Sequence, residues 1–499
     1  MNLQQLQDWK RFVPDLVKVL ELIDRKSTIA IGFSPYSRIT PALFLKNYAI
    51  YSVKDTTDND TLREYAKIFC LEERHPKVAA KVHATGYLLR NYAFQAFLKS
   101  RRLPYRLMFY QTTQKIVDTL NEFKIDWVGN EPKSFDSLKF KGEFRRIVRE
   151  RGLPCIPNKE IPREEFFQMS LRDLWELWRR SFVVQRADFD VAGELGTFFI
   201  RSKQDWETAR EILIKDERYT KLTVSPFVDG YSLSMLGCVT AQGVLSGTLQ
   251  LQLIDIPESL HGQLGTGVFM GHDFGFRPWN SEAEETAQKS VESLGAYLAD
   301  KGYRGIFGID FIMDKETGAI FPIECNPRFT GALPLYSLMS MWQGVPPLEL
   351  FHLISNLRID APFNFDEVNQ ALKQRKTISH VFLTPKGISE MKLPMASGIY
   401  SYQPKEGGIR LERYGAFPWE LKNENEFIVI DAVPRVGGRI TKNVARLFKL
   451  VFPQQIATSS FSVKPEIGQI ITKLSTALRK DQSDENDEDD SQSDEIDAI

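Results

Sequence analysis

Two acidic residues interrupt an apolar, β-prone segment at residues 308–331, which reads GIDFIMDKETGAIFPIECNPRFTG. Asp310 and Glu324 are fourteen residues apart and flank the turn-forming sequence DKETG. If the two flanking runs pair as a hairpin, both carboxylates lie on one face of neighbouring strands, with Cβ atoms about 5 Å apart. Acids inside apolar strands are unusual unless something pairs with them. The spacing therefore predicts a site that uses both carboxylates.

The pattern favours a hard divalent cation as the partner of these acids. Asn326 and Arg328 follow Glu324 at intervals of two, so a continued strand places all three side chains on the face of Asp310. A cation between two carboxylates reverses their mutual repulsion. Mg²⁺ takes one or two carboxylates together with phosphate oxygens, and a nearby arginine is suited to a transferring phosphoryl group. The alternative is a surface hairpin in which the acids occur by chance.

The pattern Gly-Ile-Asp-Phe, followed by Glu-x-Asn-Pro-Arg-x-Thr-Gly, resembles the metal-binding core of the ATP-grasp superfamily. The resemblance extends over roughly residues 25–450. It implies an α/β and α+β fold, with an N-terminal pre-ATP-grasp parallel-sheet domain, the ATP-grasp domain and a small C-terminal mixed domain. It also implies that Asp310, Glu324 and Asn326 bind one or two Mg²⁺ ions, with Mn²⁺ as an alternative, and that Arg328 is catalytic.

The resemblance further implies an ATP site with two phosphate-binding lysines. The family carries the first on a helix, eleven residues before a GxPxxP-like turn, and Lys141 stands eleven residues before Gly152. Lys139 is the competing candidate, and a solvated helix lysine is the plain alternative for either. The second lysine of the family ends a strand that here reads FVVQ. Gln185 takes its place and brings no charge.

Two further stretches complete the nucleotide site by resemblance. Gly193 and Gly196, in the loop AGELG, would let backbone N–H groups approach phosphates. The stretch VSPFVDGYS resembles the strand and hinge that hold adenine, although the family often has glutamates there. Its cofactor-binding positions are Ser225, Phe227 and Val228.

Four residues are candidates for contact with a substrate. His272 and Asp273 lie where the family has a loop facing the substrate, but a loop histidine is more often solvated. Arg435 and Arg439 either bind a substrate carboxylate or only solvate a loop, and the second interpretation is favoured. The motifs HExxH, GxxxxGK[ST], GxSxG and GxGxxG are absent, which disfavours zinc-protease, P-loop, α/β-hydrolase and Rossmann interpretations.

Hydrophobic patterns predict the elements that position these residues. Strand-like and helical runs alternate from residue 29 to about 130, which predicts a parallel sheet covered by helices. Apolar residues at helical spacing predict a helix over 133–151. Helices are also expected over 77–99 and over 442–451, the latter within a mostly stranded C-terminal segment.

A chain of 499 residues is too long for one core and is expected to form several domains. We expect a pre-ATP-grasp domain at 1–130, a nucleotide- and metal-binding domain at 131–360, a strand-rich domain at 361–462, and a helical segment with an acidic tail at 463–499. Residues 481–499 carry ten acids and no base, so removing them from the net charge of −1 leaves +9. Such a tail lacks the apolar residues to fold, and it acts as a solubilising segment or competes with phosphate ligands.

The composition points to a cytoplasmic protein. Four widely spaced cysteines argue against a disulfide framework, and no secretory signal or membrane span is expected. No basic patch interleaved with aromatic residues indicates nucleic acid. The leading hypothesis is an ADP-forming ligase that activates a small-molecule carboxylate as an acyl phosphate and joins it to an amine; an oligomer is possible. The alternatives are a regulatory nucleotide-binding protein with a degraded site and an ATP-grasp kinase or phosphotransferase.

Overall fold

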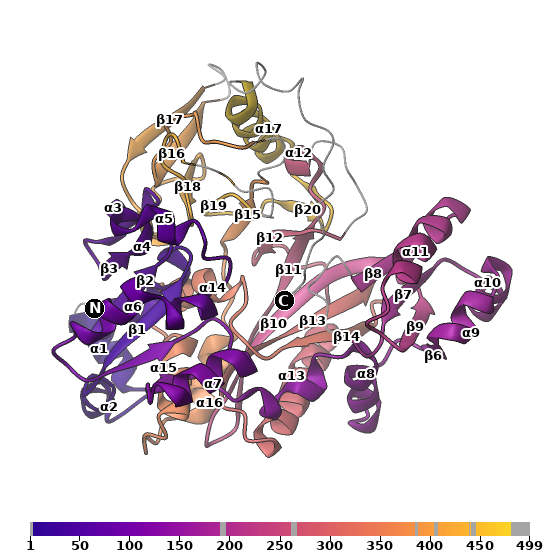
Figure 1. Cartoon of the computed structure of the whole chain (residues 1–499), viewed down its shortest axis with the longest axis horizontal. Helices are drawn as coiled ribbons and strands as arrows, with labels where there is room; N and C mark the ends of the chain where they lie inside the picture. Colours follow the sequence, from indigo (N-terminus) through magenta and orange to yellow (C-terminus); the bar gives the residue numbers. More distant parts are fainter. Residues whose placement is uncertain are drawn as a thin grey trace.

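The computed structural model describes residues 3–189, 196–260, 267–384, 388–403, 408–438, 440 and 446–480. Figure 1 shows three regions: the N-terminal elements in indigo on the left, a small sheet with its helices on the right, and the C-terminal strands at the top. In the part of the chain that the structure describes, no helix is both long and apolar enough to cross a membrane.

The N-terminal region is built on a parallel sheet, as the alternating pattern predicted. Its five strands have the order β3-β2-β1-β4-β5. A continuous helix over 77–99 is wrong, because Asn91 caps a separate helix by accepting hydrogen bonds from the N–H groups of Ala93 and Phe94. The elements are α1 Leu3–Lys10, α2 Leu16–Ile23, β1 Ser27–Gly32, β2 Tyr48–Ser52, α3 Asp58–Leu62, β3 Lys67–Cys70, α4 Leu71–Arg74, α5 Pro76–Ala79, a 3₁₀ turn Thr85–Arg90, α6 Tyr92–Lys99, β4 Tyr105–Met108, α7 Gln114–Glu122 and β5 Trp127–Val128.

The helix predicted over 133–151 begins eight residues later. Two 3₁₀ turns precede it, and the extended backbone of Phe140 separates them from α8, Lys141–Glu150. Phe135 and Leu138 are buried in the main core, so this segment follows the core surface and does not extend the helix. The later start places Lys141 in the first turn of α8.

A small sheet forms a separate unit with its own apolar core. Its strands have the order β6-β9-β7-β8. Phe182, Val184 and Val224 point into a cluster that also contains Trp206 and Leu213 of the covering helix. The elements are β6 Lys159–Pro162, α9 Arg163–Gln168, α10 Leu171–Trp178, β7 Phe182–Arg186, β8 Thr197–Ile200, α11 Lys203–Lys215 and β9 Lys221–Pro226.

A ten-stranded antiparallel sheet forms the centre of the molecule, with the order β14-β13-β10-β11-β12-β15-β19-β18-β16-β17. Because β12 pairs with β15, the sheet continues across the predicted domain limit at 360. That limit and those at 130 and 462 stay predictions. The strands are β10 Gly230–Val239, β11 Val244–Ile254, β12 Phe269–Asp273, β13 Gly305–Asp314, β14 Ile320–Asn326, β15 Ser379–Phe382, β16 Gly398–Gln403, β17 Gly408–Arg413, β18 Glu426–Ile430 and β19 Lys449–Phe452.

Helices cover both faces of this sheet. α13, Ser281–Asp300, buries Ala287, Val291 and Leu294 in the core of one face. The opposite face packs on α14 Leu333–Trp342, α15 Leu348–Asn356 and α16 Phe365–Leu372, within a core that also includes α1 and α2. The helix predicted over 442–451 is wrong in its described part, because residues 449–452 form β19; residues 441–445 lie outside the described residues. The remaining α-helices and strands are α12 Pro257–Leu260, β20 Ala457–Ser459, β21 Ser462–Val463 and α17 Pro465–Lys480, and further 3₁₀ turns are Tyr36–Arg38, Thr40–Leu43 and Pro418–Glu420.

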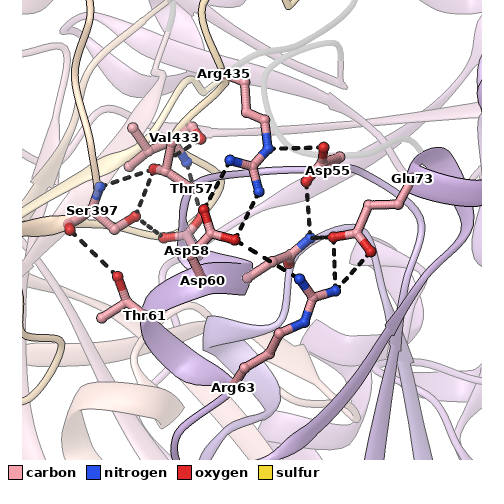
Figure 2. A network of polar contacts seen from close by, with 11 residues as sticks. Asp55, Thr57, Asp58, Asp60, Thr61, Arg63, Glu73, Ser397, Val433 and Arg435 are labelled. Atoms are coloured by element: carbon pink, nitrogen blue, oxygen red, sulfur yellow. Dashed lines mark hydrogen bonds and ion pairs between the residues drawn. The ribbon is translucent and has the colours of Figure 1, made fainter.

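A polar clamp joins the N-terminal region to the C-terminal strands (Figure 2). The buried carboxylate of Asp58 accepts hydrogen bonds from the backbone N–H groups of Asp431, Ala432 and Val433 at 2.8, 2.8 and 3.0 Å. Asp431 and Ala432 both have φ of 72°, a left-handed conformation that non-glycine residues rarely adopt. Ser397 adds a hydroxyl donor at 2.8 Å. Asp58 therefore holds the turn after β18 in a conformation that this turn would not favour alone.

Candidate active site

The predicted hairpin is confirmed. β13 pairs with β14, and Asp310 lies directly opposite Glu324. The register slips just after this pair, and Gly308 lies opposite Asn326. The apolar neighbours Ile309, Phe311 and Cys325 point into the core on the other face of the sheet. The alternation of side chains therefore brings the three expected oxygen ligands to one face.

Two side chains hold the carboxylate of Asp310 by hydrogen bonds. Its Oδ2 accepts a hydrogen bond from Asn326 Nδ2 at 2.8 Å, and its Oδ1 accepts one from Gln252 Nε2 of β11 at 3.0 Å. Burial, together with the neighbouring charge of Glu324, raises the pKa of Asp310 to about 7. Crowding of two acids in this manner is relieved by a cation between them.

Glu324 combines an enclosed position with access to solvent. Lys141 Nζ forms an ion pair with its Oε2, yet 38% of the Glu324 side chain is accessible to solvent. Burial alone would raise the pKa of Glu324, but the charges of Lys141 and Arg328 outweigh burial and lower it. Lys139 instead pairs with Asp136 at 2.8 Å. The structure therefore brings Lys141, and not Lys139, to the acids.

Arg328 links the hairpin to the N-terminal region. Its Nη2 donates to Asn326 Oδ1 at 2.8 Å, and its Nη1 donates to the hydroxyl of Tyr110 and to the carbonyl of Phe329, both at 3.0 Å. Tyr110 follows β4 of the parallel sheet. The guanidinium is therefore fixed from two sides beside the acids.

Tyr110 and Gln252 were not among the residues predicted from the sequence. A signal for Gln252 existed, because the glutamines of LQLQLI alternate with leucines that face the core, so they share the face of the site. Tyr110 carries no such signal, since it reaches the site only through the packing of two distant regions.

The oxygen ligands offered by these three side chains fit the preference of Mg²⁺. Asp310, Glu324 and Asn326 offer two carboxylates and one amide from adjacent strands, and this mixture of hard ligands is what Mg²⁺ selects. The accessible surface of Glu324 leaves room for phosphate oxygens and water to complete the coordination.

A second group of polar contacts surrounds Gln185 on β7. Gln185 Oε1 accepts a hydrogen bond from Arg145 Nη2 at 2.7 Å, and its Nε2 donates to Thr197 Oγ1 of β8 at 2.9 Å. The same Arg145 Nη2 lies 3.5 Å from Ser225 Oγ on β9. Arg186 faces the other way, as expected from strand alternation, and forms an ion pair with Asp216 at 2.9 Å. Arg145 is a further residue that the sequence analysis did not single out.

The other predicted nucleotide contacts lie around the same strands. Phe227 and Val228 follow β9, and the Phe227 N–H donates to the carbonyl of Ser181 at 2.8 Å. The guanidinium of Arg201 lies 4.7 Å from the centre of the Phe227 ring. Gly196 precedes β8 directly, whereas Gly193 lies outside the described residues.

Part of the chain that contains these residues matches a known protein family. A family model described as ATP-grasp domain matches residues 183–332, which include β7 to β9 and the β13–β14 hairpin. Residues 183–332 therefore form an ATP-grasp domain. The predicted fold class is confirmed. No curated protein sequence matches the chain.

Several solved structures superpose over most of the chain. The biotin carboxylase domain of Hydrogenobacter thermophilus 2-oxoglutarate carboxylase, in complex with MgADP, ADP and bicarbonate, has a TM-score of 0.58 at 11% identity and covers 86% of each chain. N5-carboxyaminoimidazole synthase from Aspergillus clavatus, in complex with ADP and 5-aminoimidazole ribonucleotide, has a TM-score of 0.51 at 11% identity, covering 91% of this chain and 99% of that one. An L-amino acid ligase from Bacillus licheniformis has a TM-score of 0.50 at 12% identity, covering 91% and 98%. At such identities the likeness shows the fold alone.

Of the two substrate candidates on β12, only His272 shares the site face, because it pairs with Gln252. It is 2% exposed, its Nδ1 has no hydrogen-bond partner among the described residues, and its ring lies 5.3 Å from that of His380. Burial, with the charges of Lys449 and Arg446 nearby, lowers the pKa of His272 to about 3, so the ring is neutral.

Asp273 faces away from the site, which makes its predicted substrate contact wrong. Its carboxylate is fully buried and accepts four backbone N–H groups, at 2.7 to 2.9 Å, from Gly275, Phe276, Ile456 and Ala457. It therefore ties two loops together.

Arg435 also forms ion pairs, both with acids of the N-terminal region. It forms ion pairs with Asp55 at 2.8 Å and with Asp60 at 2.9 Å, in the clamp of Figure 2. The favoured interpretation, that Arg435 only solvates a loop, stays a prediction. Arg439 lies outside the described residues.

Proposed function

We propose that this ATP-grasp protein is an ADP-forming ligase that activates a small-molecule carboxylate as an acyl phosphate and joins it to an amine. The observation that carries the proposal is the convergence of two opposed carboxylates, an asparagine, an arginine and a helix lysine on one face of the hairpin. The neighbours described as a biotin carboxylase with MgADP and bicarbonate and as an L-amino acid ligase support it. The five residues are Lys141, Asp310, Glu324, Asn326 and Arg328.

The acids and the asparagine would hold the magnesium of bound ATP. Asp310, Glu324 and Asn326 are the ligands, and the ion supplies Lewis-acid polarisation and a template for the phosphates. Gln252 of β11 fixes the carboxylate of Asp310 at 3.0 Å, reaching it across β10, which lies between β11 and β13. This contact keeps one ligand in place before the nucleotide arrives.

Lys141 and Arg328 would act on the phosphates. In the ligand-free protein Lys141 neutralises Glu324. When Glu324 instead faces a cation, Lys141 Nζ becomes available to phosphate oxygens. Arg328 is held by Asn326 and Tyr110, so its fork is oriented before the reaction and neutralises charge on the phosphoryl group as it is transferred to the carboxylate.

A regulatory nucleotide-binding protein is the second candidate, and one observation favours it. Gln185 stands where ATP-grasp enzymes that the chain resembles have a charged lysine. Such a protein would bind nucleotide without turnover.

The test is ADP release from MgATP by the purified chain, across pools of carboxylates and amines, beside Glu324→Gln. We expect release that needs both substrate classes and is lost in the variant. Glu316→Gln is the matched control, because Glu316 is an exposed acid in the turn of the same hairpin. Nucleotide binding without turnover in any pool would favour the regulatory candidate, and a Glu324→Gln variant as active as Glu316→Gln would reject the site.

A further inference from the structure

Arg145 carries a buried charge that forms no salt bridge with any described residue, although the charge of Glu160 acts on it from farther away. Its side chain lies inside the protein, with the residue 8% exposed, and both contacts of its Nη2, Gln185 and Ser225, are neutral. Its Nη1 is inaccessible and has no hydrogen-bond partner among the described residues. Burial lowers the pKa of Arg145 to about 10, so the group remains charged at neutral pH. A buried charge without an ion-pair partner is costly, and an anionic ligand would supply that partner.

The position of Arg145 indicates which ligand this is. Arg145 lies four residues after Lys141 on α8, so both side chains project from one face of the helix. Lys141 reaches the metal-binding hairpin, and Arg145 reaches β7 and β9 of the small sheet. Figure 1 shows α8 beside β14, where the two sheets meet. The two cationic side chains therefore lie at the same junction of the two sheets. Lys141 is beside the expected magnesium ligands, and Arg145 is one helical turn farther along α8, beside the small sheet.

Gln185 is arranged to hold Arg145. Its amide nitrogen is engaged by Thr197, which turns its oxygen toward the guanidinium at 2.7 Å. A lysine at position 185 would bring a second positive charge into this contact. The neutral residue on the strand and the cation on the helix are thus compatible with each other, whereas two cations would repel.

We propose that Arg145 is the second phosphate-binding cation of the nucleotide site, and that Gln185 is the positioning residue that orients it. The ligand is a nucleoside di- or triphosphate, whose oxygens match the planar fork of a guanidinium. This inference rests on the proposed function, since it needs a nucleotide at the junction of the sheets.

A purely structural role for Arg145 makes a different prediction. If Arg145 only ties α8 to the small sheet, its removal lowers the melting temperature of the ligand-free protein. If it is a charge that awaits a ligand, its removal leaves that temperature unchanged or raises it, because binding sites commonly cost stability.

The experiment measures binding of ADP with Mg²⁺, and of adenosine, by calorimetry, together with ligand-free melting temperatures. The variants are Arg145→Gln, the double variant Arg145→Gln/Gln185→Lys, and the control Arg149→Gln, an exposed arginine one turn along the same helix. We expect Arg145→Gln to weaken ADP binding by about 10- to 100-fold, the loss of charge-assisted hydrogen bonds, with adenosine binding unchanged. The lysine on the strand restores ADP binding in the double variant, and Arg149→Gln binds as the wild type does.

Two results would overturn the inference. One is equal ADP affinity of Arg145→Gln and wild type. The other is loss of ADP and adenosine binding together, with a lowered ligand-free melting temperature and no rescue by Gln185→Lys. If the wild type itself binds no ADP, the proposed function fails and this inference fails with it, whereas the first two results leave the proposed function standing.

Discussion

Lys141 on α8 and Glu324 on β14 form an ion pair between residues 183 positions apart in the sequence. The pair ties α8 to the β13–β14 hairpin. A bound cation would compete with Lys141 for the carboxylate of Glu324. Binding of a nucleotide with its magnesium ion would therefore break the Lys141–Glu324 ion pair.

Replacing Lys141 tests that rearrangement. Lys141→Met removes the charge but keeps most of the side-chain volume, and we expect ADP affinity to fall by about 10- to 100-fold. Lys139→Met is the control, because Lys139 pairs with Asp136 in the preceding turn. Calorimetry with MgADP measures both. Equal losses in the two variants would show that Lys141 has no special role.

Asp310→Asn should separate stability from function. The wild type places two carboxylates opposite each other in the fold, and burial raises the pKa of Asp310 to about 7. The amide removes this repulsion, so we expect a higher melting temperature for the ligand-free variant at pH 8. We also expect Mg²⁺ to lose its effect on nucleotide binding, because one of two carboxylate ligands is gone. Binding that still strengthens with Mg²⁺ would place the ion elsewhere.

The hairpin was predictable because its information is local. Alternating apolar residues, the turn DKETG and two acids in register specify the pairing of Asp310 with Glu324 without reference to distant residues. Tyr110 was not predictable, since its contact with Arg328 requires two regions to pack together. Arg145 escaped notice for another reason: in the helix KGEFRRIVRE it is one of three arginines, and sequence alone does not reveal which one is buried.

Glu349 should make stability depend on pH away from the site. It is buried, its Oε2 accepts a hydrogen bond from Ser337 at 2.5 Å, and burial raises its pKa from 4.5 to about 7. The folded state therefore keeps a proton that the unfolded state releases between these values. Stability from this group is present below pH 4.5 and is lost as pH rises through 7.

Glu349→Gln removes this titration. We expect the variant to exceed the wild type in unfolding free energy by about 1–3 kcal/mol at pH 8, with a smaller difference at pH 5, as measured by urea denaturation. Glu316→Gln, at an exposed position, should follow the wild type at both pH values. A difference that does not change with pH would exclude Glu349 as the titrating group.

Asp58→Asn should weaken the clamp between the N-terminal region and the C-terminal strands. The carboxylate accepts three backbone N–H groups and a hydroxyl, and an amide would direct its own N–H toward one of these donors. Leaving buried donors unpaired costs about 2–4 kcal/mol, so we expect a loss of this size in urea denaturation.

Asp60→Asn is the matched control for the clamp. Asp60 lies two residues after Asp58 in α3 and pairs with Arg435 at 2.9 Å. Because this ion pair is partly exposed, we expect it to contribute only about 0–1 kcal/mol to stability. Hydrogen exchange locates the effect: in Asp58→Asn the amides of residues 431–433 should lose protection, since their acceptor is the altered group, whereas in Asp60→Asn they should keep it. Equal protection in both variants would show that the left-handed turn holds its conformation without Asp58.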